Sequence, residues 1–175
     1  PRLENTTPAR FSDALGLIRR SGYGWEAEML QLMDEQGLVR IDPSIPPLAV
    51  ADADTGISLH PTFVSSCIPG SGKPNELERL REALELATVL FHEFYHFKRK
   101  RTQGTILPDE PTAYNREQEF LYGLYQTENP GCDRANLIKE YARSRWHAGH
   151  QMAIGSDYAG LSTPDTYYPT TNFNF

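Results

Sequence analysis

Residues 92–96 read His-Glu-Phe-Tyr-His, and these residue types are the ones that hydrolysis by a bound metal ion requires. On an α-helix, residues four apart lie one turn above each other, so His92 and His96 are expected to aim their imidazoles at one ion. Glu93 is rotated by about 100° from His92, which lets it miss the ion and reach a water bound there. Zinc lowers the pKa of such a water from about 15.7 to about 7, and Glu93 would be the general base. The motif therefore predicts one Zn²⁺ ion and hydrolysis.

The motif and the residues that follow it resemble the zincin metallopeptidases, and more narrowly their glutamate-liganded branch, the gluzincins. In that branch a later helix supplies the third zinc ligand from a Glu-x-x-Ala motif, which Glu110-Pro111-Thr112-Ala113 matches here. The continuation over residues 117–121 is similar to the corresponding helix of small bacterial metallopeptidase and toxin-effector domains. The resemblance covers about residues 80–125. It implies a zincin-like fold with Glu110 as the third ligand.

Two other carboxylates are alternatives for the third ligand. Glu117 lies two turns after Glu110 on the same face of the expected helix, and it is the second choice. Asp109, which follows Gly104 and Thr105, has a fainter similarity to the ligand of the aspartate-liganded zincins. A catalytic zinc site needs three protein ligands and one open position, so one of these carboxylates suffices.

Several residues near the end of the chain are candidates for stabilising a tetrahedral oxyanion. Such an oxyanion needs a donor besides the metal, and in this family the donor is commonly a His or a Tyr. The available side chains are Tyr141, His147, His150 and Tyr158. His147 and His150 also form a His-x-x-His pair, for which a surface position is expected more often than a ligand role. The sequence does not choose among the four.

Residues 56–60 alternate apolar and polar side chains shortly before the metal-binding motif, as a strand at the edge of a sheet does. In zincins an edge strand borders the cleft and binds the substrate main chain in extended form. The resemblance thus implies that Ile57, Ser58, Leu59 and His60 form a substrate-binding edge. A plain structural strand is an equal alternative.

The motif is predicted to lie on a long, rigid helix, which Asn75 caps and which ends at about Arg101. Apolar residues recur there at steps of three and four, namely Leu77, Leu80, Leu84, Ala87, Phe91 and Phe94. The basic run over residues 98–101 complements the negative end of the helix dipole and needs no nucleic acid to explain it.

Other elements follow from periodicity and from the Gly and Pro positions. Further helices are predicted over about residues 12–20 with Ser12 as the cap, 25–36 with Gly37 as the stop, 109–125 and 134–150. Short extended runs at residues 38–41, 47–51 and 57–60 predict a small, partly antiparallel sheet. The fold class is therefore α+β: a helix-rich domain with a small mixed sheet, an active-site helix and a later ligand-bearing helix.

Composition limits the function classes. A chain of 175 residues with 39% hydrophobic content fits one domain over residues 1–175, in which 156–175 are expected to be an irregular tail packed on it. The net charge of −6 argues against a nucleic-acid partner. The sequence contains no run of 18 or more apolar residues, so no membrane span is predicted. A soluble protein is expected. Cys67 and Cys132 are too few for a disulfide scaffold; they either pair or are free thiols.

The leading hypothesis is an endopeptidase that binds a polypeptide substrate. A zinc amidase acting on cell-wall peptides and a non-catalytic binding module on a zincin fold are the alternatives. Glu93 argues against the binding module, because a purely structural zinc site has no use for that carboxylate. The resemblance also favours a bacterial effector or toxin that is secreted or delivered into another cell, and a chain that begins at Pro1 is expected to be a processed form or a piece of a longer protein. Cleavage specificity and oligomeric state are not indicated.

Overall fold

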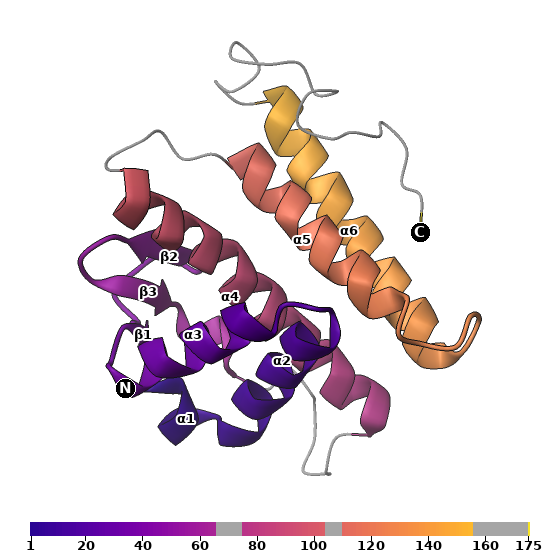
Figure 1. The fold of residues 1–175 in the computed structure, drawn as a ribbon, viewed down its shortest axis with the longest axis horizontal. Coiled ribbons are helices and arrows are strands. Elements are labelled where there is room, and N and C mark those ends of the chain that lie inside the picture. The colour runs from indigo at the N-terminus through magenta and orange to yellow at the C-terminus, as the bar shows by residue number, and fades with distance from the viewer. Residues whose placement is uncertain (66–74, 104–109, 156–174) are drawn as a thin grey trace.

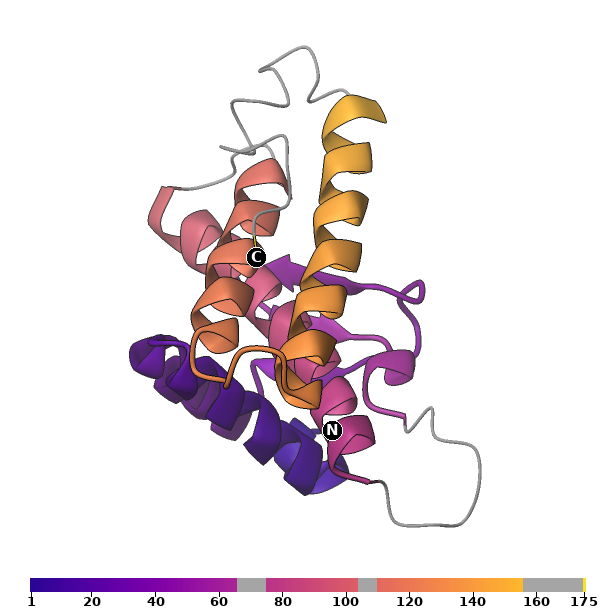
Figure 2. The same cartoon turned by 90° about the vertical axis from the view of Figure 1, so that its right-hand side faces the viewer.

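The computed structural model describes residues 1–65, 75–103, 110–155 and 175 (Figure 1). In chain order the elements are α1 (Leu3–Thr6), α2 (Pro8–Arg20), α3 (Gly24–Glu35), β1 (Val39–Ile41), β2 (Ala49–Asp52), β3 (Gly56–Leu59), the 3-10 helix η1 (Pro61–Phe63), α4 (Glu76–Gln103), α5 (Glu110–Tyr125) and α6 (Asp133–Gly155). Helix α4 runs through the middle of the molecule. Helices α2 and α3 and the sheet pack on one side of it, while α5 and α6 lie side by side on another (Figures 1 and 2).

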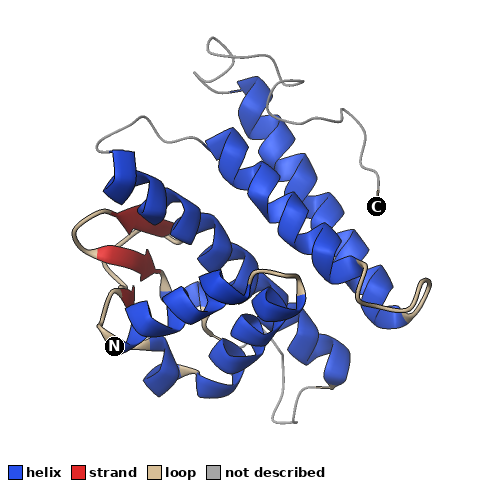
Figure 3. Ribbon diagram, viewed as in Figure 1, coloured by secondary structure: helices blue, strands red, loops and turns tan. Residues whose placement is uncertain are grey.

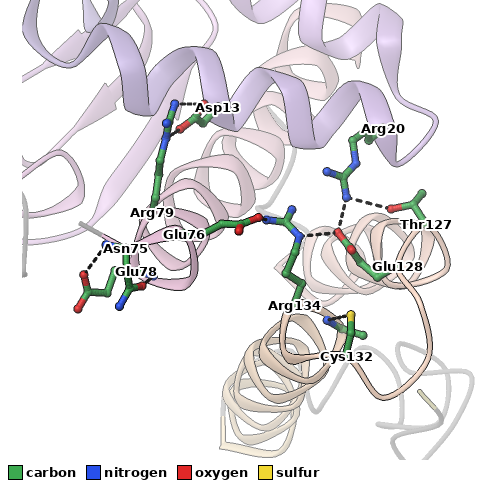
Figure 4. Close-up of polar contacts among 11 residues, drawn as sticks. Asp13, Arg20, Asn75, Glu76, Glu78, Arg79, Thr127, Glu128, Cys132 and Arg134 are labelled. Atoms are coloured by element: carbon green, nitrogen blue, oxygen red, sulfur yellow. Dashed lines mark hydrogen bonds and ion pairs between the residues drawn. The ribbon is translucent and has the colours of Figure 1, made fainter. Parts of the chain in front are cut away.

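Helix α4 begins at a capping box, as the sequence predicts. The Asn75 side chain accepts a hydrogen bond from the Glu78 backbone N–H at 2.9 Å, and the Glu78 carboxylate accepts one from the Asn75 N–H at 2.9 Å (Figure 4). Both bonds satisfy N–H groups that have no partner within the helix. The predicted apolar stripe is buried from Leu80 onward, whereas Leu77, in the first turn, is 37% exposed. The helix therefore lies in the core along most of its length.

The two helices before the sheet differ in how well their ends were predicted. Helix α2 begins at Pro8 and not after Ser12, because proline is well suited to the first helical position and Ser12 lies inside the helix. The predicted stop of α3 at Gly37 is confirmed: Gly37 has a φ of +74°. The Leu38 and Gly37 N–H groups donate to the carbonyls of Met33 and Asp34 at 2.8 and 3.0 Å, which is a Schellman motif.

The sheet has three strands in the order β1-β3-β2, with β1 parallel and β2 antiparallel to β3. The prediction that Ile57–His60 form a sheet edge is wrong, because β3 is the central strand and pairs on both sides. His60 lies beyond the strand and caps η1. The alternating pattern misled because polar Ser58 is buried at 4% exposure and accepts a hydrogen bond from Arg40 Nε at 3.1 Å.

The predicted α+β class is confirmed: the described residues form a helix-rich domain with one small mixed sheet (Figure 3). Helix α5 ends at Tyr125 as predicted, and α6 continues past the predicted end at His150 to Gly155. No helix in the described ranges combines the length and apolar character needed to cross a membrane. Cys132 is a free thiol. Cys67, Asp109 and the predicted tail, apart from Phe175, fall outside the described residues.

Candidate metal centre

Three side chains of the predicted motif are buried on the inner side of α4. His92, Glu93 and His96 are 6%, 7% and 6% exposed. Buried imidazoles and carboxylates are costly unless each has a partner, so their surroundings decide what they can do. The partners of His92 and His96 come from α5, which packs against α4.

The two imidazoles and Glu110 converge on one point. His92 Nε2 and His96 Nε2 lie 3.1 Å apart. One carboxylate oxygen of Glu110 is 3.0 Å from His92 Nε2, and the other is 3.0 Å from His96 Nε2. One ligand atom from each of the three residues can be chosen so that all lie within 4.8 Å of one another, as a common metal ion requires. Two imidazole nitrogens and a carboxylate are a donor set that suits Zn²⁺.

Glu117 lies on the other edge of the His92 ring. Its Oε1 is 2.6 Å from His92 Nδ1, and the side chain is fully buried. Arg145 of α6 binds the same carboxylate with two hydrogen bonds, from Nε at 2.8 Å and from Nη2 at 2.6 Å. Glu117, the alternative third ligand, thus faces away from the point where the Nε2 atoms meet. It orients the His92 ring, and Arg145 holds the carboxylate in place.

Two residues of this site were not predicted. Tyr114 is 8% exposed, and its ring meets the His92 ring edge-on, with centroids 5.1 Å apart and planes at 78°. The Arg145 guanidinium lies over the Tyr114 ring, with its Cζ 5.1 Å from the centroid. Tyr114 follows Glu110 by one helical turn, which is a signal that could have identified it. No sequence signal connects Arg145 with residues so far away along the chain.

The charges of the site shift the pKa values of its members. Burial lowers the pKa of His92, but hydrogen bonds to Glu110 and Glu117 outweigh it and raise the pKa to about 10. Burial raises the pKa of Glu110, but hydrogen bonds from His92 and His96 outweigh it, so the pKa lies well below its usual range. Burial raises the pKa of Glu93. Glu93 therefore binds a proton more readily than Glu110 does.

The four oxyanion candidates have different positions. The pKa of Tyr141 is raised by burial. His147 is exposed on α6, and its ring packs against Trp146 with centroids 5.0 Å apart. The side chain of His150 and the whole of Tyr158 are outside the described residues. Of the two candidates whose side chains are described, Tyr141 thus packs against the core and His147 lies at the surface.

Comparisons of the chain with protein-family models, with curated proteins and with solved structures gave no match.

Proposed function

We propose that the chain is a zinc-dependent metallopeptidase in which His92, His96 and Glu110 bind the ion. The proposal depends above all on one observation: the Nε2 atoms of two buried imidazoles and the carboxylate of Glu110, which is 25% exposed, meet at one point. Three protein ligands leave a coordination position open, as in catalytic zinc sites, whereas structural sites use four. The proposal includes a zincin-like fold, and it is supported by the order of the active-site helix α4 and the ligand-bearing helix α5.

A bound zinc ion would polarise the peptide carbonyl and lower the pKa of a water to about 7. Glu93 would be the general base that accepts the proton of the attacking water and the general acid that returns it to the leaving amine. Its burial suits this task, because a carboxylate with a raised pKa binds the proton more strongly than a solvated one.

Glu117 and Arg145 orient the ring of His92, one of the three proposed ligands. The Nδ1–H of His92 donates to Glu117, so Nε2 is the nitrogen that would exchange its proton for the ion. The two hydrogen bonds from Arg145 hold the Glu117 carboxylate in one orientation. The His92 ring is therefore held, before the ion arrives, in the orientation that metal binding needs.

The choice of peptide bonds as the substrate is supported by the resemblance of the His-Glu-x-x-His and Glu-x-x-Ala motifs to the gluzincins. The geometry of the site by itself supports metal-assisted hydrolysis and does not select the substrate. Casein, an unfolded polypeptide, is the substrate with which to begin.

The substitution Glu93→Gln tests the mechanism. Zinc content of the purified variant, measured by mass spectrometry, is expected to equal that of the wild type, because Glu93 is not a ligand. Casein hydrolysis is expected to fall by about 10²–10⁴-fold, since the amide cannot accept the proton. Glu140→Gln, the same change at an exposed position of α6, is the matched control and should retain full activity.

Undiminished hydrolysis by Glu93→Gln would contradict the role of Glu93. Wild-type protein that contains no zinc after zinc supplementation would contradict the metal site. Hydrolysis of peptidoglycan without hydrolysis of casein would identify cell-wall peptides as the substrate class and would not contradict the proposed metal site.

A further inference from the structure

A concave surface lies between α3 and the C-terminal half of α4. The groove has a volume of about 260 Å³, and its apolar lining comprises Trp25, Met29, Leu32, Met33, Leu38, Phe94 and Phe97. Polar residues at its border are Gln36, Lys98, Arg101 and Thr102. Nothing in the proposed hydrolysis uses this surface.

The groove opens on the side of α4 away from the metal centre. At about 100° per residue, Phe94, Phe97 and Arg101 lie about 140–200° around the helix from His92. A segment bound in the groove therefore does not reach the ligands, and the groove is no subsite of the active site. Whatever it binds is held at a distance from the reaction.

Large apolar side chains are exposed there. Trp25 is 52% exposed and Leu32 is 44% exposed, although both belong to the residue types that folding normally buries. Two of the three methionines of the chain, Met29 and Met33, also line the groove. Methionine is flexible and polarisable, so it adapts to side chains of different shapes. Concave apolar surface of this kind is typical of sites that bind a partner.

The charge of the groove is opposite to that of the chain. The net charge is −6, yet no carboxylate lines the groove within the described part of the chain, while Lys98 and Arg101 do. Their cationic groups lie over aromatic rings, Lys98 Nζ 5.1 Å from the centroid of Trp25 and Arg101 Cζ 5.6 Å from that of Phe97. Neither forms an ion pair with another described residue. Both cations are thus free to bind an anion at the border of an apolar floor.

The helix dipole does not explain this arrangement. Two other residues of the basic run have partners of their own: Lys100 Nζ donates to the Ala51 carbonyl at 2.6 Å, and Arg99 donates to Gln103 at 3.2 Å. The two cations that remain, Lys98 and Arg101, are one turn apart and both border the groove. A dipole would be satisfied by cations on any side of the helix.

We propose that this groove binds an acidic, amphipathic segment of another protein. Ligand pockets for whole small molecules have volumes of about 300–1,000 Å³, so 260 Å³ suits a few apolar side chains of a longer segment better. A groove between two helices receives such side chains from one face of a bound helix. Carboxylates flanking that face would pair with Lys98 and Arg101. The proposal does not depend on the zinc site.

A selection from a library of random peptides of about 15 residues tests the proposal, because that length allows a short helix. Peptides are selected for binding to the wild-type chain and against the variant Lys98→Glu/Arg101→Glu. The enriched sequences are expected to be acidic, with apolar residues three or four positions apart. Fluorescence anisotropy of the most enriched peptide then gives its Kd.

The charge-reversed variant and Leu32→Asp are each expected to weaken binding by about tenfold or more, and added salt is expected to weaken it as well. The matched controls lie at the other end of α4. Arg81→Glu changes an exposed cation and Leu77→Asp an exposed leucine, and neither should alter the Kd. Glu93→Gln should bind as the wild type does, so failure here and failure of the catalytic proposal are distinguishable.

Other outcomes would overturn the proposal. They are a selection without enrichment, enriched peptides that are not acidic, and equal binding to the variants. Dimerisation in solution that Leu32→Asp abolishes would make a second copy of the chain the occupant. Binding to vesicles of phosphatidylserine and phosphatidylcholine that depends on Trp25, without binding of peptides, would make the occupant a lipid surface.

Discussion

At the scale of the residue, the two glutamates of α5 have different functions because they face different atoms of one imidazole. Glu110 and Glu117 are two turns apart on the helix, about 10 Å along its axis, and reach His92 from different directions. Glu110 meets the Nε2 atoms of both histidines. Glu117 meets Nδ1 and is held by Arg145. In the proposed metal site the same residue type therefore supplies a ligand in one case and orients a ligand in the other.

Substitution of each glutamate by glutamine should separate these functions. Glu117→Gln is expected to weaken zinc binding by about 10–100-fold, which is the usual cost of losing a partner outside the ligand shell. Glu110→Gln should weaken it by more, because the ligand itself is lost. Competition with a chromophoric chelator measures both affinities.

Glu119→Gln is the control on the same helix, since Glu119 is 55% exposed and pairs with Arg116. Circular dichroism and urea unfolding of each variant show whether the fold is retained. A larger loss of zinc affinity in Glu117→Gln than in Glu110→Gln would reverse the assignment of ligand and orienting residue.

At the scale of the element, the sheet depends on a tight turn between β2 and β3. The Asp52 carboxylate accepts hydrogen bonds from the backbone N–H groups of Asp54 and Thr55 at 3.0 and 2.9 Å. Gly56 follows with a φ of +88°, and a Cβ there would lie 2.0 Å from the Leu38 carbonyl oxygen. Only glycine allows the central strand to start so close to the residue that precedes β1.

Gly56→Ala is therefore expected to destabilise the fold strongly, by about 3 kcal/mol or more, since the backbone must move to relieve the contact. Gly37→Ala is the matched control. Gly37 also has a positive φ, of +74°, but a Cβ there would meet no atom within 4 Å, so only conformational strain of about 1–2 kcal/mol is expected. Urea unfolding measures both, and equal costs would show that the contact with Leu38 is unimportant.

At the scale of the whole molecule, α4 is connected to its neighbours in two different ways. Near the N-terminal end of α4, Arg134 bridges Glu76 and Glu128, and Asp13 pairs with Arg79 (Figure 4). The Glu76–Arg134 and Asp13–Arg79 pairs are exposed, so each contributes little to stability, whereas the Glu128–Arg134 pair is partly buried. Deeper in the fold, the buried contacts of His92 with α5 and, through Glu117, with Arg145 of α6 connect three helices. A metal ion at this point would stabilise all three together.

Zinc is accordingly expected to raise the free energy of unfolding of the wild type by about 2.7 kcal/mol at a free concentration one hundred times its Kd. The effect should shrink as the pH falls. In the metal-free protein the pKa of His92 is raised from 6.5 to about 10, so zinc must displace a proton from it at neutral pH. Thermal unfolding with and without zinc at several pH values measures the effect.

In the metal-free protein, the contribution of His92 to the free energy of unfolding should change with pH in the opposite direction to the zinc effect. Because the folded pKa lies above the unfolded one, that contribution is fully present below about pH 6.5 and is lost as the pH rises through about 10. His96→Ala is the control, in which zinc should no longer stabilise the fold. A zinc effect that grows as the pH falls would contradict protonation of His92 in the metal-free site.

The sequence by itself determined the features that depend on neighbours along the chain. The helical face shared by His92 and His96, the cap at Asn75 and the stop at Gly37 follow from local spacing and local backbone geometry, and the structure contains all three. The tertiary structure alone decided which edge of His92 each glutamate meets and that Arg145 holds Glu117. It also decided that Ile57–Leu59 belong to the central strand of the sheet and not to an edge strand. These depend on how separate elements pack, and period-2 or period-3.6 patterns describe one element at a time. Strand order and the approach of α6 to α5 are set by contacts between residues far apart in sequence, for which a single chain carries no local signal.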